Sequence, residues 1–205
     1  MNSPHDPLAE DGRLDPFACA AFLIAAFVLA GLAQVAWLRS PLSLLFRIPI
    51  DGGRKVRGRR VFGDNKTWGG FVVMVPAVGT VCLLLGLARG LLPAVWSRGL
   101  WPLTTPGYGL LGCWLGLGFM AGELPNSFLK RQLGIAPGAA PRNRLGRRLC
   151  FLLDRLDSIA GATLALALVL PAPLGTCLAI LLIGPGVHWL FSVLLYRLGM
   201  KARPA

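Results

Sequence analysis

Long apolar runs alternate along the chain with shorter stretches rich in basic residues. The apolar positions are continuous rather than alternating, which favours helices over strands. Several runs approach the roughly 20 residues that a helix needs to cross a hydrocarbon core of about 30 Å. Because lipid admits only helices or closed barrels, we predict an all-α polytopic membrane protein. Its five spans are expected at about 17–38, 68–88, 107–128, 150–170 and 173–196.

Two of these spans have too few apolar residues to cross on their own. The third meets Glu123 early, and the fourth is clearly apolar only after Ser158. Each must borrow turns from a charged stretch, GELPNSFLKRQLGI at 122–135 and CFLLDRLDS at 150–158. Ionisable groups at that depth are costly and usually line a cavity or bind a ligand.

Composition supports one integral-membrane domain covering residues 1–205. The chain is 55% hydrophobic and 15% charged, against about 25% charged in a soluble domain. Its five cysteines are scattered, which argues against a disulfide framework and favours helix packing. The N-terminal tail is acidic, unlike the basic start of a cleavable signal, so the first span is expected to be retained.

Basic residues set the expected orientation. Of 21 lysines and arginines, 18 fall in the first basic loop (39–67), the second basic loop (122–157) and the C-terminal tail. The positive-inside rule puts these segments in the cytosol and the N-terminus outside. The protein is expected in the cell (inner) membrane. Five of the nine acids also fall in the two loops, so chemistry is expected at the cytosolic face.

The DRLDS stretch offers a metal site. Asp154 and Asp157 are three residues apart, so on a helix they share a face. Oxygen ligands without nearby cysteine or histidine suit Mg²⁺. The alternative is a solvated acidic pair stabilised by a helix N-terminus.

Two further stretches could hold phosphates. Ser127, Lys130 and Arg131 share a helix turn in GELPNSFLKR, and Lys66 stands before the second span in FGDNKTWGG, a natural anion site. The alternatives are a positive-inside anchor and a snorkelling lysine. Because the second span begins, the third ends and the fourth begins at the inner face, all three stretches are expected to meet.

FGDNKTWGG, GELPNSFLKRQLGI followed by PG, and DRLDS together resemble the CDP-archaeol synthase family, within the wider CTP:phosphatidate cytidylyltransferase group. The resemblance implies Mg²⁺-assisted transfer of CMP from CTP to a lipid phosphate, which gives a CDP-lipid and pyrophosphate. It implies catalytic roles for Lys130, Asp154 and Asp157, and metal binding by Glu123, Asp154 and Asp157. The implied CTP and phosphate ligands are Asp64, Asn65, Lys66, Thr67, Asn126, Ser127, Lys130 and Arg131.

The chain departs from the archaeal pattern at two positions. Gly69 stands where that pattern has arginine, and Glu123 where it has aspartate. The lipid acceptor and the number of metal ions are therefore left open. Whether the protein forms a homodimer is also left open. His188 is more typical of a structural residue, and its role is left open. The segment 184–186 is expected to kink or break the fifth span.

Two other functions compete with this interpretation. CDP-alcohol phosphotransferases need a D-x-x-D-G signature with later aspartates, but Ser158 follows Asp157 and no later acid exists. A non-catalytic module could bind anionic lipid or nucleic acid through the net charge of +12. That reading leaves the five acids of the basic loops unexplained, so we expect no nucleic-acid partner.

Overall fold

The computed structural model describes residues 14–91, 97 and 99–200. Five helices of 21 to 28 residues dominate this part of the chain. They are α1 (Pro16–Arg39), α2 (Trp68–Ala88), α4 (Thr105–Gln132), α5 (Arg144–Val169) and α6 (Leu174–Arg197). Short elements join them: the 3₁₀ helices η1 (Pro41–Phe46) and η2 (Arg89–Leu91), and the strands β1 (Lys55–Val56) and β2 (Arg59–Arg60).

The all-α prediction is confirmed, and α1, α2 and α6 lie within one residue of their predicted ranges. Three helices, α1, Trp68–Leu91 and α6, are long and apolar enough to cross a membrane, so the chain is a multi-pass membrane protein. Helices α4 and α5 do not meet that criterion, and their crossing stays a prediction. The acidic tail before residue 14 and the basic residues beyond 200 lie outside the described residues.

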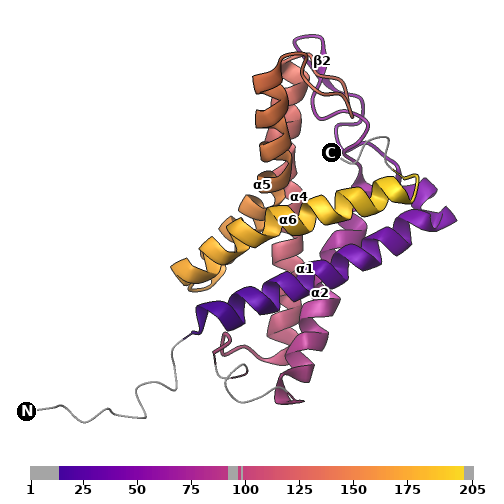
Figure 1. Cartoon of the computed structure of the whole chain (residues 1–205). Helices are drawn as coiled ribbons and strands as arrows, with labels where there is room; N and C mark the ends of the chain where they lie inside the picture. Colours follow the sequence, from indigo (N-terminus) through magenta and orange to yellow (C-terminus); the bar gives the residue numbers. More distant parts are fainter. Residues whose placement is uncertain (1–13, 92–96, 98, 201–205) are drawn as a thin grey trace, which may run out of the picture.

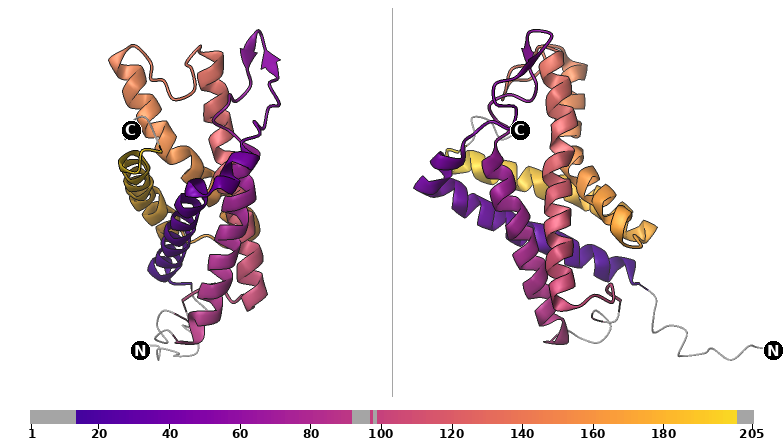
Figure 2. Two further views of the ribbon diagram at one scale, coloured as in Figure 1. Left: turned by 90° about the vertical axis from the view of Figure 1, so that its right-hand side faces the viewer. Right: turned by 180° about the vertical axis from the view of Figure 1, so that it is seen from behind.

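The helices cross in two directions. Figure 1 shows α1 and α6 running obliquely across the steeper α2 and α4, and Figure 2 shows the same crossing from behind. Helices α4 and α5 lie against each other, as do α2 and α4. The second basic loop is largely helical, because α4 continues to Gln132 and α5 starts at Arg144, earlier than predicted.

Helix α6 runs unbroken through Gly184-Pro185-Gly186, so the break considered for this segment is wrong. A proline inside a helix removes only one backbone donor, and neighbouring helices in a membrane protein can compensate. The two-residue strands were also not predicted. They form a hairpin that turns at Arg57 and Gly58, both with positive φ (52° and 78°).

The buried core runs along α4 from Tyr108 to Met120, one turn before Glu123, and includes residues of α1 and α2. Tyr108 is fully buried and donates its hydroxyl hydrogen to the Trp101 carbonyl at 2.6 Å. The Trp101 indole in turn donates to the Pro171 carbonyl at 2.8 Å. These bonds tie the start of α4 to the connection between α5 and α6. The opposite end of α4 is left for polar residues.

Candidate active site

A close crossing of α4 and α5 brings the two charged stretches together. A Cβ on Gly122 would lie 2.9 Å from the Gly161 Cα, and one on Gly161 would lie 2.7 Å from the Gly122 Cα. Real Cβ atoms do not approach so closely, so only glycines let these backbones meet. Asp157 lies one turn before Gly161 on the same face of α5. The crossing therefore aims Asp157 at α4.

Asn126 links the two aspartates of α5. Its amide nitrogen donates to Asp154 Oδ1 and to Asp157 Oδ2, each at 2.7 Å. Lys130, one turn further along α4, forms an ion pair with the same Asp154 oxygen. The predicted acidic pair is thus not solvated separately, because one amide and one lysine from α4 hold it.

A second ion pair connects the start of α2 to α4. Lys66 pairs with Glu123 Oε2, and Ser158 donates its hydroxyl hydrogen to Glu123 Oε1 at 2.8 Å. Burial disfavours the charge on Lys66, but the Glu123 carboxylate outweighs this effect and raises the pKa of Lys66 above its ordinary value. Lys66 is therefore a charged lysine held inside the protein.

Asp51 organises the first basic loop, a role that sequence reasoning missed. Its carboxylate is buried and accepts hydrogen bonds from the Arg60 guanidinium and from the backbone N–H groups of Gly53, Phe62 and Gly63. The hydrogen bonds from Arg60 lower the pKa of Asp51 below its ordinary value. Burial raises this pKa and so opposes the shift, whereas the backbone N–H donors lower it further. These bonds fix the loop immediately before Asp64.

The hairpin then docks on the end of α4. Arg59 donates to the Gln132 carbonyl, and the Gln132 amide donates to the Arg60 carbonyl at 3.4 Å. Gly63, at φ 87°, lies so close to Arg131 that a Cβ there would be 3.2 Å from its guanidinium. Burial lowers the pKa of Arg131 from its ordinary value, and Asp154 opposes that shift.

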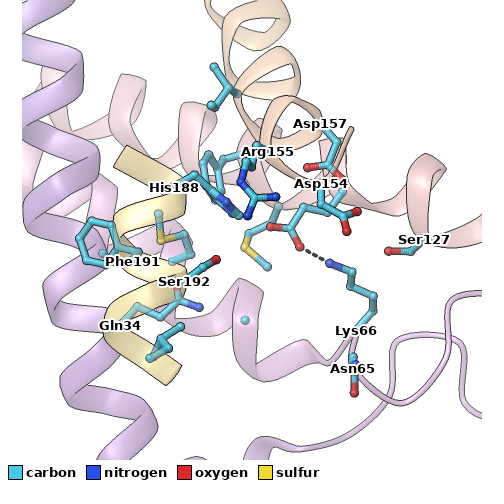
Figure 3. Close-up of a pocket in the computed structure, with 18 of the residues that line it drawn as sticks. Gln34, Asn65, Lys66, Ser127, Asp154, Arg155, Asp157, His188, Phe191 and Ser192 are labelled. Atoms are coloured by element: carbon cyan, nitrogen blue, oxygen red, sulfur yellow. Dashed lines mark hydrogen bonds and ion pairs between the residues drawn. The ribbon is translucent and has the colours of Figure 1, made fainter. Parts of the chain in front are cut away.

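These residues surround one cavity of about 1150 Å³. Figure 3 shows its polar part, with Asp154 and Asp157 near Lys66 and Ser127. The cavity also extends between the helices along apolar side chains, which include Leu23, Phe27, Val35, Phe71, Met74, Leu115, Phe119, Leu166, Ile180 and Phe191. We call the part around Lys66, Asp154 and Asp157 the charged chamber and the part lined by the apolar side chains the apolar channel. Both belong to the same cavity.

The predicted meeting of the three stretches is confirmed by these contacts. The cavity is lined by Asp64, Asn65, Lys66, Thr67, Glu123, Ser127, Lys130, Arg131, Asp154 and Asp157, and Asn126 contacts both aspartates beside it. Asp64 differs from the rest, since its side chain is 71% exposed and pairs with Arg60 at 2.8 Å. The chemical roles of all these residues stay predictions.

The donor set fits a divalent cation in part. Asp154 and Asp157 direct oxygens at a single point, now marked by the Asn126 amide, and Mg²⁺ prefers such all-oxygen ligands. Glu123 faces Lys66 and Ser158 instead. Within residues 14–91, 97 and 99–200, no three His, Cys, Asp or Glu residues form a group that could hold a metal by themselves.

Comparison with known proteins gives a consistent result. Residues 21–204 match the family model of the CarS-like CDP-archaeol synthases. The CDP-archaeol synthase of Halobacterium salinarum is 33% identical over 171 residues, which cover 76% of this chain and 82% of that protein. Its counterpart in Methanopyrus kandleri is 38% identical over 162 residues, with coverages of 76% and 79%. The one in Pyrococcus furiosus is 33% identical over 169 residues, with coverages of 80% and 88%. No solved structure matches the chain.

Proposed function

Because the chain belongs to the CDP-archaeol synthase family, and is therefore a CTP-dependent cytidylyltransferase that makes a CDP-lipid, we propose that the cavity described above is its active site. There it would transfer CMP from CTP to a lipid phosphate and release pyrophosphate. The observation that carries this proposal is the continuity of the charged chamber with the apolar channel. One substrate of this reaction is a polyphosphate and the other has long apolar chains, so both kinds of surface are needed.

The polar residues suit displacement at phosphorus. An oxygen of the lipid phosphate attacks the α-phosphorus of CTP, and the bond from that phosphorus to the oxygen bridging to the β-phosphate breaks. Pyrophosphate leaves with the electron pair. Lys66, Lys130 and Arg131 line the chamber and would neutralise charge on the nucleotide phosphates.

No side chain needs to remove a proton from the acceptor. The second pKa of a phosphate monoester is about 6, so the lipid phosphate is mostly dianionic at neutral pH. Of the two histidines in the sequence, His5 lies outside the described residues and His188 lines the cavity, where this reaction gives it no proton to remove.

Asp154 and Asp157 would hold Mg²⁺, and Glu123 would join them if Lys66 turned to a phosphate. When bound, the ion would supply positive charge to the transferred and leaving phosphates. Asn126 and Lys130 would keep the two aspartates aligned, since both contact Asp154. By the positive-inside rule the chamber opens to the cytosol, where CTP is available.

The test is an assay of purified protein with labelled CTP, Mg²⁺ and a panel of lipid phosphates with ether or ester linkages. Wild type should form a CDP-lipid, and the panel identifies the acceptor. Asp157→Asn should abolish turnover, while Lys130→Ala should mainly weaken use of CTP. Arg148→Gln, at an exposed position of α5, is the control and should keep its activity.

Two results would contradict the proposal. Lipid binding without CDP-lipid formation for any acceptor would favour the anionic-lipid-binding module. Near-normal CMP transfer by Asp157→Asn would remove this residue from the reaction, even if wild type is active.

A further inference from the structure

Helix α5 turns two different faces to its neighbours. Asp157 and Gly161 face α4, as shown by the bond from Asn126 and by the close approach of Gly122. Ile159 faces α6 instead, because a Cβ on Gly184 would lie 2.7 Å from its side chain. Arg155 is one turn before Ile159 and therefore shares the α6 side.

Arg155 is a buried cation that Asp154 attracts only from beyond ion-pair distance. The residue is only 6% exposed, although it lines the cavity. One guanidinium nitrogen donates to the Phe151 carbonyl of its own helix at 2.6 Å, and the guanidinium carbon lies 3.3 Å from the centre of the Phe151 ring. Its Nε has no hydrogen-bond partner. Among the described residues no carboxylate forms an ion pair with it.

Such an arrangement favours an anionic ligand. Buried charges are normally paired, because removing them from water is costly. The planar guanidinium has five donors and matches the oxygens of a phosphate. Stacking on Phe151 holds the Arg155 guanidinium in place and leaves donors available to a ligand in the cavity.

The position of Arg155 indicates which phosphate it would meet. In Figure 3 Arg155 lies between His188 and Asp154, whereas Ser127 lies beyond the aspartates and Lys66 approaches them from below. Phe191 of α6, part of the apolar channel, is on the Arg155 side in the same view. A lipid whose chains occupy this channel brings its phosphate to the α6 side of the aspartates.

We propose that Arg155 binds the phosphate of the lipid acceptor, while the cations of α4 and Lys66 hold the nucleotide. This inference rests on the proposed function and assigns its two anionic substrates to opposite sides of the Asp154–Asp157 pair. The acceptor class is a phosphate monoester carried on apolar chains.

Two-substrate kinetics in mixed micelles test this assignment. Arg155→Gln should raise the KM for lipid phosphate about ten- to a hundredfold, the range expected for a lost charged hydrogen bond. Its KM for CTP should stay within about twofold of wild type, a change too small to count as a lost contact. Arg155→Lys keeps the charge but loses the fork, so its defect should be smaller. Arg148→Gln, also in α5 but exposed, controls for the loss of one positive charge.

Thermal unfolding supplies a readout that does not depend on turnover. Lipid phosphate should raise the melting temperature of wild type but not of Arg155→Gln, while CTP should protect both. An unchanged KM for lipid phosphate, or an equal rise in the KM values for lipid phosphate and CTP, would overturn the inference. If Arg155→Gln does not fold, the same two KM values measured for Arg155→Lys decide the question. If wild type makes no CDP-lipid, the proposed function fails, and the lipid-phosphate shift still tests Arg155 by itself.

Discussion

The Lys66–Glu123 ion pair should stabilise the protein as well as serve the reaction. Its side chains are only 22% and 18% exposed, so it behaves more like a buried pair than a surface pair. Removing one partner of a buried pair costs about 3–5 kcal/mol because the other charge is left uncompensated. The residual exposure favours the lower end, about 3 kcal/mol. Either Lys66→Met or Glu123→Gln should therefore lower the melting temperature by about 6–12 °C.

The double variant separates the two contributions. Lys66→Met combined with Glu123→Gln removes both charges, so no isolated ion remains and much of the stability should return. The coupling free energy from the four proteins should be about 2 kcal/mol. CDP-lipid formation should stay low in all three variants, because the lysine and the carboxylate are predicted to contact substrate or metal.

Unfolding in detergent micelles and a CTP-dependent assay on the same preparations measure both quantities. Additive destabilisation by the two substitutions would refute the view that the pair acts as a unit. Recovery of activity in the double variant would show that the pair has only a structural role.

Further predictions concern the elements that shape the chamber. Gly161→Ala should destabilise the protein by about 1–3 kcal/mol through overpacking and should lower its activity. Gly186→Ala, where an added Cβ would meet nothing within 4 Å, is the control and should change neither. Equal melting temperatures of the two variants would contradict the close crossing of α4 and α5. Asp51→Asn should be less stable than wild type near neutral pH. Because the folded pKa of Asp51 is lowered, its contribution is present above about pH 4, the ordinary range of the group, and is lost as pH falls further. Unfolding followed from pH 7 to 3 should therefore show a constant difference in stability between the two proteins down to about pH 4 and a narrowing difference below it. A difference that does not narrow below about pH 4 would contradict this role.

Much of the helical layout could be predicted from the sequence. Continuous apolar runs fix α1, α2 and α6 because they match the thickness of a bilayer. The meeting of Lys66, Glu123 and Asp157 followed from topology, since three charged helix ends at one membrane face must lie near each other. The predicted start of α5 is too late, because the exposed Arg144, Arg147 and Arg148 resemble a loop in the sequence although they belong to the first turns of the helix.

Other features depend on contacts that no local pattern reveals. Asp51 looks like an ordinary loop acid, and its function arises from donors nine to twelve residues away. The hairpin turn includes Arg57 in the left-handed region, where glycine or asparagine is usual. Arg155 looks like one more basic residue on the cytosolic side. In the structure, Arg155 differs from the exposed arginines nearby in its burial, its stacking on Phe151 and its place on the α6 side of α5.

The polar site also adds charged residues to α4 and α5, which are both predicted to cross the membrane. A charged residue near the centre of a membrane helix costs about 2.5–3.5 kcal/mol on insertion scales. Helix α4 carries Glu123 within its predicted span, whereas Lys130 and Arg131 lie in its last turn, where long basic side chains can reach the interface. Pairing with Lys66 and Asp154 from other segments offsets part of that cost. The predicted crossing of α4 and α5 therefore depends on contacts within the bundle, and these contacts include ion pairs formed by groups predicted to act in the reaction. In the proposed reaction, the nucleotide phosphates would compete with Glu123 and Asp154 for Lys66 and Lys130. Binding of the nucleotide would then free these carboxylates to hold a metal ion.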